Sequence, residues 1–398
     1  MTASSTVPES LRRRRNSILL TMTAFFWFSM YTYPSILTPY LTELGATLTQ
    51  SGLVIGSYGL TQTLLRLPGG ILSDRLRNKR IFVIFGMFVS LISALGLFFF
   101  QDLVLILVFR ALTGVAAATW VHSSTLYMSY QEAGKAPQAM GILNFINNIG
   151  QMAAMLAGSF LAQNFGWRFA FLAGAIGATG GLAISFFITE DRPEPVAADQ
   201  LVTLRNTIGI GRDRILFWTS VLALLSQVGT FATIQGFVPQ YASLLGADKA
   251  QLGMLTAFSS LPRAIAGLIG GSLLARYFKL RSLIVIGFAL TGTVTCLLPL
   301  VHTLPVLFAS QFLAGVGIGL QFTLLMSLCT QTIAQNRKAS AMGFFQAVYG
   351  IGMVIGPVLI GLLADTFGLG TGFVIIGIVT LLTAVLTAFV LKPNLEMI

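Results

Sequence analysis

The stretch GGILSDRLRNKR at residues 69–80 returns in altered form as GGSLLARYFKLR at residues 270–281. Two glycines, a leucine and two arginines keep their positions at a spacing of 201 residues, and each copy lies between two long apolar stretches. A nearly constant offset along a chain indicates the duplication of one structural unit. Further matches lie 201 or 202 residues apart: Gly45 with Gly246, Gly52 with Gly253, Gly114 with Gly315, 139–141 with 341–343, and 165–166 with 367–368.

Composition places the chain in a lipid bilayer. Of its 398 residues, 55% are hydrophobic and only 9% are charged, and the mean hydropathy is +0.83. A soluble globule needs more polar surface than this. Apolar stretches of roughly 20 residues, the length of a helix that spans a hydrocarbon core of about 30 Å, recur from end to end. We therefore predict an all-α membrane protein with twelve transmembrane helices, at about 17–42, 51–72, 81–100, 103–129, 138–162, 168–188, 214–244, 251–275, 282–301, 304–332, 339–364 and 371–391.

The centre of the chain holds its one long polar segment. Residues 189–213 combine acidic, basic and proline residues, and we predict that they form a cytoplasmic linker. This linker would separate an N-terminal six-helix bundle at 1–188 from a C-terminal six-helix bundle at 214–398. Two copies with the same orientation give parallel repeats, and the binding site of such proteins lies at the interface between the repeats.

The basic residues follow the pattern of a membrane protein rather than that of a nucleic-acid-binding protein. The net charge is +11, but 19 of the 24 lysines and arginines fall at the termini or in the even-numbered connections between the predicted helices. The odd-numbered connections hold only Arg168 and Lys249. The positive-inside rule then places both termini in the cytoplasm, so we predict a multi-pass protein of the cell inner (cytoplasmic) membrane with no nucleic-acid partner.

Two short motifs carry a family resemblance. Residues 70–80, read as Gly-x-Leu-Ser-Asp-Arg-x-x-x-Lys-Arg in the predicted connection between helices 2 and 3, resemble the signature loop of the major facilitator superfamily, with Arg77 in place of the usual second glycine. Arg110 and Gly114 in helix 4 resemble a motif of many proton-linked members. The resemblance covers the whole chain and implies the major facilitator fold, in which two pseudo-symmetric six-helix halves transport a solute.

The same resemblance implies a gating role for Gly70, Asp74 and Arg75, because in the family this loop holds the two halves together on the cytoplasmic face. Helix 11 is predicted to begin near Ala339, so its positive end would face Asp74 and favour the carboxylate by about 0.3 to 1 kcal/mol. The alternative is that Asp74 and its basic neighbours are ordinary solvated loop charges. In the second copy Ala275 replaces Asp74, so the contact is expected in one copy only.

Three arginines lie within predicted helices, whereas all 13 acidic residues fall in tails, connections or helix ends. A cation near the middle of a membrane costs at least about 2.5 kcal/mol unless it faces water or a partner. Arg263 lies nearest the midplane, and the absence of a nearby acid predicts that it pairs with an anionic substrate. The alternative is that carbonyls and amides satisfy it. Arg66 is predicted to act in gating, to reach the interface or to contact the substrate, and Arg110 to bind substrate or to be a structural hydrogen-bond donor.

Polar residues at repeat-related positions predict a ring around a central cleft. Asn144 and Asn147 in helix 5 correspond to Gln346 and Tyr349 in helix 11, and Gln62 in helix 2 corresponds to Arg263. We predict that these residues orient the substrate. The alternative is that they form hydrogen bonds between helices.

These patterns predict a secondary active transporter that moves a small organic anion across the cytoplasmic membrane by alternating access. The rival is a proton-coupled exporter of lipophilic drugs or lipids, favoured by 31 Phe and 13 Met. An enzyme is not expected, because the chain has two His, two separated Cys and no acidic residue deep in a predicted helix. No cofactor and no metal site is predicted; the expected partners are an anionic small molecule, the bilayer and a coupling proton, and the expected state is a monomer.

Overall fold

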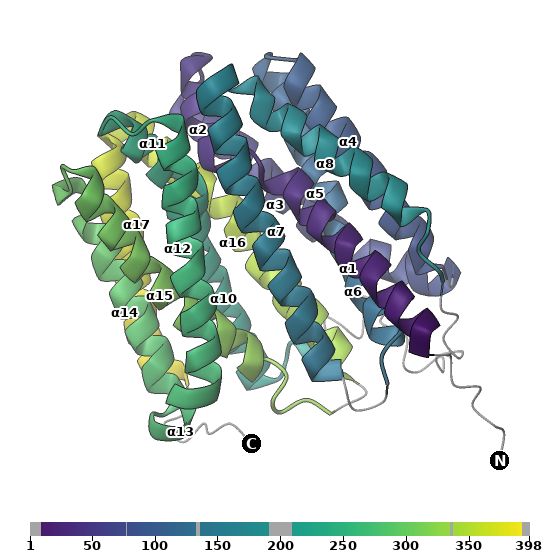
Figure 1. Ribbon diagram of the computed structural model, residues 1–398. Coiled ribbons are helices and arrows are strands. Elements are labelled where there is room, and N and C mark those ends of the chain that lie inside the picture. The colour runs from purple at the N-terminus through teal and green to yellow at the C-terminus, as the bar shows by residue number, and fades with distance from the viewer. Residues whose placement is uncertain (1–8, 77, 133–135, 191–208, 335–336, 392–398) are drawn as a thin grey trace.

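The computed structural model describes residues 9–76, 78–132, 136–190, 209–334 and 337–391, which form helices and no strand (Figure 1). Before residue 190 the helices group into six membrane-length segments. They are α1 (Glu9–Tyr31) with α2 (Pro34–Glu43), α3 (Leu48–Leu76), α4 (Lys79–Phe99), α5 (Leu103–Ala118) with α6 (Trp120–Ser129), α7 (Ala136–Phe165) and α8 (Arg168–Ser185).

After residue 209 the helices again group into six segments. They are α10 (Arg214–Ala232) with η2 (Thr233–Phe237) and α11 (Val238–Leu244), α12 (Lys249–Ile269) with η3 (Gly270–Leu274) and α13 (Ala275–Tyr277), α14 (Leu280–Leu297) with η4 (Leu298–Leu300), α15 (Leu304–Leu328), α16 (Lys338–Phe367) and α17 (Leu369–Val390). The prediction of a twelve-helix, all-α protein in two six-helix halves is confirmed. The bounds 1–188 and 214–398 remain a prediction, and residues 191–208 of the predicted linker lie outside the described residues.

Nine segments in the described ranges are long and apolar enough to cross a membrane. The three other segments are more polar. The segment of α1 and α2 carries the basic run 12–15, α3 carries Arg66, and α7 carries the polar side chains within 144–151. The fifth helix of each half, α7 and α16, has 30 residues. At 1.5 Å per residue such a helix extends about 45 Å, which is well beyond the hydrocarbon core.

The first helix of each half is broken at the same depth. α1 ends at Tyr31, and Pro34 begins α2; the second half has the π-helical turn η2, which begins at Thr233, 201 residues after Thr32. A π-turn leaves backbone carbonyls without their usual partners, and Thr38 Oγ1 donates a hydrogen bond of 2.6 Å to the Gly236 carbonyl. The sequence predicted one continuous helix at 17–42; the proline explains the break, because it lacks the N–H that the helix would need there.

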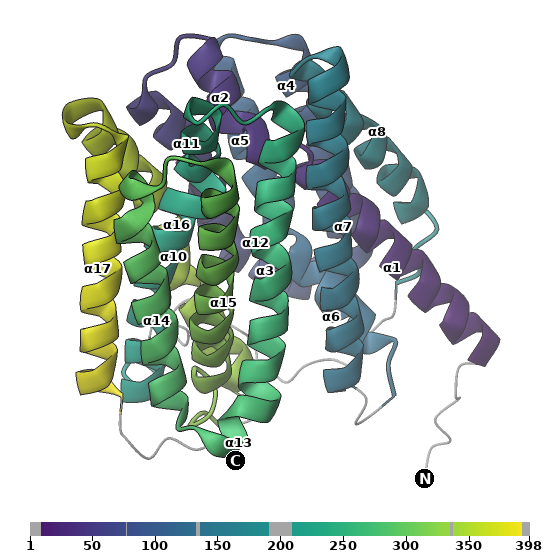
Figure 2. The ribbon, with the colours of Figure 1, turned by 60° about the vertical axis from the view of Figure 1, so that its left-hand side comes forward.

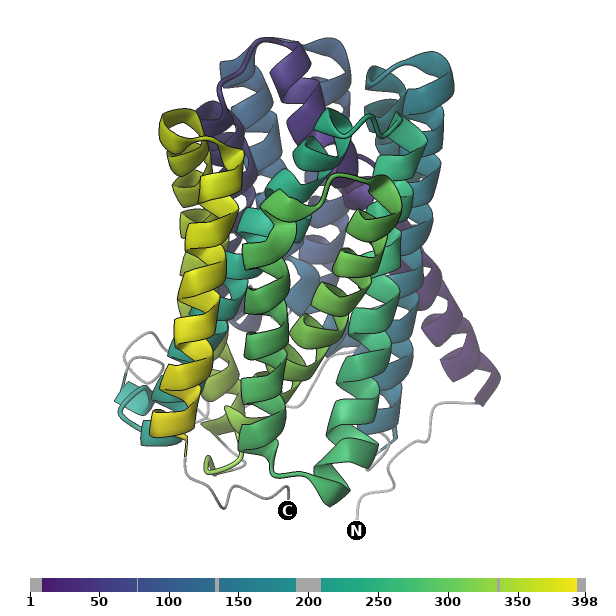
Figure 3. The same ribbon diagram turned by 90° about the vertical axis from the view of Figure 1, so that its left-hand side faces the viewer.

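The two halves lie side by side, and α1 begins and α17 ends at the same end of the bundle (Figure 2 and Figure 3). We call this end the terminal side. The opposite end, which carries the connection between α2 and α3 and the connection at Gly368 between α16 and α17, is the far side.

Close helix contacts join the halves toward the far side. A Cβ on Gly52 of α3 would lie 2.2 Å from the Pro357 carbonyl oxygen of α16, and a Cβ on Gly253 of α12 would lie 2.5 Å from the Ser159 side chain of α7. Only glycine allows such an approach. In contrast, a Cβ on Gly70, near the terminal-side end of α3, would meet no atom within 4 Å. The halves are thus in tight contact toward the far side, and this contact does not extend to Gly70.

Candidate functional site

Arg263 lies near the middle of the segment formed by α12, η3 and α13. A capping box of Asp248 and Gln251 fixes the start of α12, and Arg263 is 14 residues after its first residue, or about 21 Å along the helix. The side chain is half-buried. Within the described residues its guanidinium forms no hydrogen bond and no ion pair, and its electrostatic partner is Tyr31 of α1, in the other half. Arg263 therefore faces the interface between the halves.

Tyr31 interacts electrostatically with both central arginines, Arg263 and Arg110, and its hydroxyl lies near that of Tyr58 of α3. The Arg110 guanidinium carbon lies 4.6 Å from the centre of the Tyr58 ring. We call Tyr31, Tyr58, Arg110 and Arg263 the central cluster; the first three come from the N-terminal half, and the fourth comes from the C-terminal half.

Arg110 is anchored within its own half. It is 5% exposed, and its Nη1 donates a hydrogen bond of 2.8 Å to the Tyr33 hydroxyl. Tyr33 in turn is 2.8 Å from the Thr113 hydroxyl, which is 2.7 Å from the Ser93 hydroxyl. This network supports the structural alternative for Arg110, although its side chain also forms one wall of the central cluster.

Arg66 joins the two halves. Its Nη1 donates hydrogen bonds of 3.1 Å to Gln346 Oε1 and 3.1 Å to the Tyr349 hydroxyl, both on α16. Gln346 and Tyr349 therefore bind Arg66, one helix turn beyond Gln62, rather than Arg263. Tyr349 is held in place by its edge-on contacts with Phe322 and Phe345.

The other residues of the predicted polar ring are not brought together. Gln62 is 6% exposed and makes no hydrogen bond to the described residues. Asn147 accepts a hydrogen bond from Gln151 on its own helix, and Asn144 is exposed. The described contacts do not connect either asparagine to Arg263.

The gating residues lie at the terminal-side end of α3. The sequence placed Asp74 and Arg75 in a connection, but α3 continues to Leu76, so their backbone is helical; their side chains lie outside the described part of the structure. A Cβ on Gly70 would meet no atom within 4 Å, and the Gly69 carbonyl is 3.1 Å from Nε2 of His122 on α6. The helix continues because arginine and leucine favour helix, and because neither proline nor glycine follows Gly70 in α3.

Asp365 makes a cross-half contact on the far side that the sequence analysis missed. Its carboxylate accepts the backbone N–H groups of Leu48 at 2.9 Å and Thr49 at 2.8 Å, at the start of α3. The first N–H groups of a helix lack partners within the helix, and its N-terminal end attracts negative charge. The repeat mate of Asp365, 202 residues earlier, does the same for α12: Gln163 Oε1 accepts the Lys249 N–H at 3.0 Å.

We expect Asp365→Ala to destabilise the closed far side by about 1 kcal/mol, because the N–H groups of Leu48 and Thr49 lose their acceptor from the other half and the attraction between a carboxylate and a helix end is lost. The measurement is the labelling rate of Ser159→Cys, buried between α7 and α12, by a membrane-impermeant maleimide applied at the far side, with Cys296 and Cys329 replaced by Ser. Labelling should rise about fivefold. The neutral Gln163→Ala should have a smaller effect, and equal labelling of all three proteins would contradict this role for Asp365.

The sequence matches the model of one known protein family over nearly its whole length. The model of the Major Facilitator Superfamily matches residues 19–246 and 219–396. An uncharacterized MFS-type transporter of Methanocaldococcus jannaschii is 28% identical over 366 residues, which cover 87% of this chain and 92% of that protein. A purine ribonucleoside efflux pump of Escherichia coli is 27% identical over 377 residues (90% and 89%), and a cis,cis-muconate transport protein of Acinetobacter baylyi is 24% identical over 355 residues (82% and 81%).

Solved structures agree on the fold. A bacterial homologue of the human lysosomal transporter Spinster, in an inward-facing and occupied conformation, superposes with a TM-score of 0.80 at 14% identity, covering 96% of this chain and 97% of that one. A nucleoside transporter superposes with a TM-score of 0.77 at 15% identity, covering 95% and 99%. Since the family model covers nearly the whole sequence and the twelve helices form the expected two halves, the chain belongs to the major facilitator superfamily and is a multi-pass membrane transporter.

Proposed function

We propose that this transporter is a secondary active one that moves a small organic anion across the cytoplasmic membrane by alternating access, with Arg263 as the charge partner of the substrate. The observation that supports this proposal is the half-buried Arg263 guanidinium, which faces the opposite half and has neither a carboxylate nor a hydrogen-bond acceptor among the described residues. A substrate carboxylate, sulfonate or phosphate would supply both, in the two-point geometry that a guanidinium favours.

The central cluster explains how such an anion would be coupled to the motion of the halves. The anion would pair with Arg263 of the C-terminal half, while the hydroxyls of Tyr31 and Tyr58 belong to the N-terminal half. A ligand bound to both halves stabilises the conformation in which both sets of contacts form, and this differential affinity drives a conformational change. If the N-terminus is cytoplasmic, as the charge pattern predicts, the terminal side faces the cytoplasm. The contacts of Gly52 and Asp365 would then close the conformation described here to the outside.

In the opposite conformation, Gly70, Asp74 and Arg75 would close the cytoplasmic side. Arg66 would then exchange its contacts with Gln346 and Tyr349 as α3 and α16 move. Each chain contains both halves, so the proposed working unit is a monomer, and the proposed coupling ion is a proton.

The rival function is proton-coupled export of lipophilic drugs or lipids. A lipophilic cation would be favoured by a carboxylate partner, whereas the central cluster contains two arginines and two tyrosines. The relatives named above transport, by their names, a purine ribonucleoside and the dicarboxylate muconate. A neutral nucleoside is thus a further candidate, and the test has to include it.

A thermal-shift screen of the purified protein separates these functions, because a ligand that binds the folded state raises its melting temperature. The compounds are small carboxylates, sulfonates, phosphorylated compounds, nucleosides and ethidium. We expect saturable stabilisation by at least one of the anions, weakened by added salt, and none by ethidium. Stabilisation by ethidium or by nucleosides alone would overturn the assignment of an anionic substrate.

A further inference from the structure

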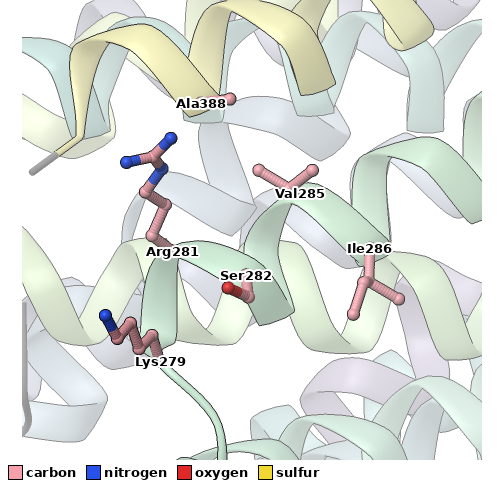
Figure 4. A pocket seen from close by; sticks show the side chains of 6 residues that line it. All are labelled: Lys279, Arg281, Ser282, Val285, Ile286 and Ala388. Atoms are coloured by element: carbon pink, nitrogen blue, oxygen red, sulfur yellow. The ribbon is translucent and has the colours of Figure 1, made fainter. Parts of the chain in front are cut away.

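A basic groove lies between α14 and α17 at the terminal side. It has a volume of about 390 Å³ and is lined by Lys279, Arg281, Ser282, Val285, Ile286 and Ala388. Figure 4 shows the amino group of Lys279 and the guanidinium of Arg281 at one end of the groove, with Val285 and Ile286 toward the other. We call it the α14–α17 groove. It does not include any residue of the central cluster.

The arginine at the corresponding position of the N-terminal half forms hydrogen bonds within the protein. Arg80, the repeat mate of Arg281, donates from Nη2 to the Phe186 carbonyl at 2.7 Å, and its backbone N–H donates to Glu190 Oε2 at 2.7 Å. Phe186 is the mate of Ala388, 202 residues later. The corresponding hydrogen bond from Arg281 is not formed, and neither Arg281 nor Lys279 has a hydrogen bond or an ion pair within the described ranges.

Among the described residues, the duplication therefore leaves two cations without a partner in one half only. Their positive charges favour an anionic ligand, and both side chains lie at the same end of the groove (Figure 4). Apart from the Ser282 hydroxyl, the rest of the lining is apolar, because Val285, Ile286 and Ala388 offer no hydrogen-bonding side chain. A site with a cationic end and an apolar wall matches a ligand with a charged head and hydrocarbon chains.

The level of the groove in the membrane indicates that this ligand is a lipid. Lys279 and Arg281 lie at the start of α14, and Ala388 lies near the end of α17, so the groove is at the level where helices leave the hydrocarbon core. Basic pockets between transmembrane helices at this level bind the headgroups of anionic lipids. We propose that the α14–α17 groove binds an anionic phospholipid of the terminal-side leaflet, with its phosphate between Lys279 and Arg281 and an acyl chain along Val285 and Ile286.

The test is a titration of the purified, delipidated full-length protein with dioctanoyl phosphatidylglycerol, followed by melting temperature. The wild type should be stabilised in a saturable manner. The variant K279Q/R281Q should need at least tenfold more lipid for the same shift. Arg276→Gln removes one exposed positive charge from the neighbouring helix α13 without touching the groove, and it should titrate like the wild type.

Two further arms identify the ligand. Dioctanoyl phosphatidylcholine and inorganic phosphate at equal concentrations should not reproduce the shift, because the first lacks net charge and the second lacks chains. Val285→Trp, which fills the apolar part and keeps both cations, should weaken lipid binding as well, so the proposal is testable even if K279Q/R281Q does not fold. Equal titrations of wild type, K279Q/R281Q and Val285→Trp would overturn the site, and an equal shift with inorganic phosphate would overturn the lipid as its ligand.

Discussion

Replacing Arg263 by Gln is expected to abolish transport of the anionic substrate while the folded protein remains in the membrane. The change removes a charge-assisted pair worth about 3 kcal/mol, which corresponds to more than a hundredfold in affinity. The fold should tolerate it, because the Arg263 guanidinium makes no hydrogen bond or ion pair to the described residues. The measurement is uptake of the labelled anion into proteoliposomes, with protein content and melting temperature determined in parallel.

Three variants control this experiment. Arg263→Lys keeps the charge but loses the fork of donors, so it should retain partial transport. Arg276→Gln, which also removes one positive charge but at an exposed position, should transport like the wild type. Arg110→Gln should instead lower the melting temperature, because Arg110 is buried and bonded to Tyr33. Undiminished uptake of the anion by Arg263→Gln would rule out the role proposed for Arg263.

Valine at Gly52 and valine at Gly70 are expected to shift the conformational equilibrium in opposite directions. A Cβ on Gly52 would lie 2.2 Å from the Pro357 carbonyl oxygen, whereas a Cβ on Gly70 would meet nothing within 4 Å. Overpacking of this kind costs about 1–3 kcal/mol. Gly52→Val therefore penalises the conformation with the far side closed. Gly70→Val leaves it untouched and penalises the opposite conformation, in which Gly70 is proposed to approach the other half.

Labelling of Ser159→Cys from the far side reports this equilibrium, because Ser159 is buried against Gly253 in the closed state. We expect labelling to rise at least fivefold in Gly52→Val and to stay at or below the wild-type rate in Gly70→Val. Melting temperatures check that both variants are folded. If both variants raised labelling equally, the claim that the two glycines lie in the contacts of opposite conformations would be wrong.

The architecture could be predicted because local sequence patterns indicate it. Apolar stretches about 20 residues long mark helices, and the recurrence of GGILSDRLRNKR after 201 residues marks the duplication. The structure confirms both. The finding that no described acidic residue pairs with Arg263 was also predictable, because no acidic residue lies near the middle of any predicted helix.

The contacts of the site could not be predicted, because they depend on how distant helices meet. Asp365 binds the start of α3 across 316 and 317 residues of sequence, and Arg66 meets Gln346 across 280. Tyr31 and Tyr58 were missed, since a tyrosine in a membrane helix carries no sign of its neighbours. One signal was available: Tyr31 stands three residues before Pro34, and a broken helix in a transporter often lies beside the substrate.

The most direct test of the account is equilibrium binding of the stabilising anion to wild type and Arg263→Gln, measured in the same detergent at two salt concentrations. We predict that the wild type binds with an affinity that falls as salt rises, and that Arg263→Gln binds at least a hundredfold more weakly with little dependence on salt. Equal affinities and equal salt dependence in the two proteins would contradict the central claim that Arg263 holds the transported anion.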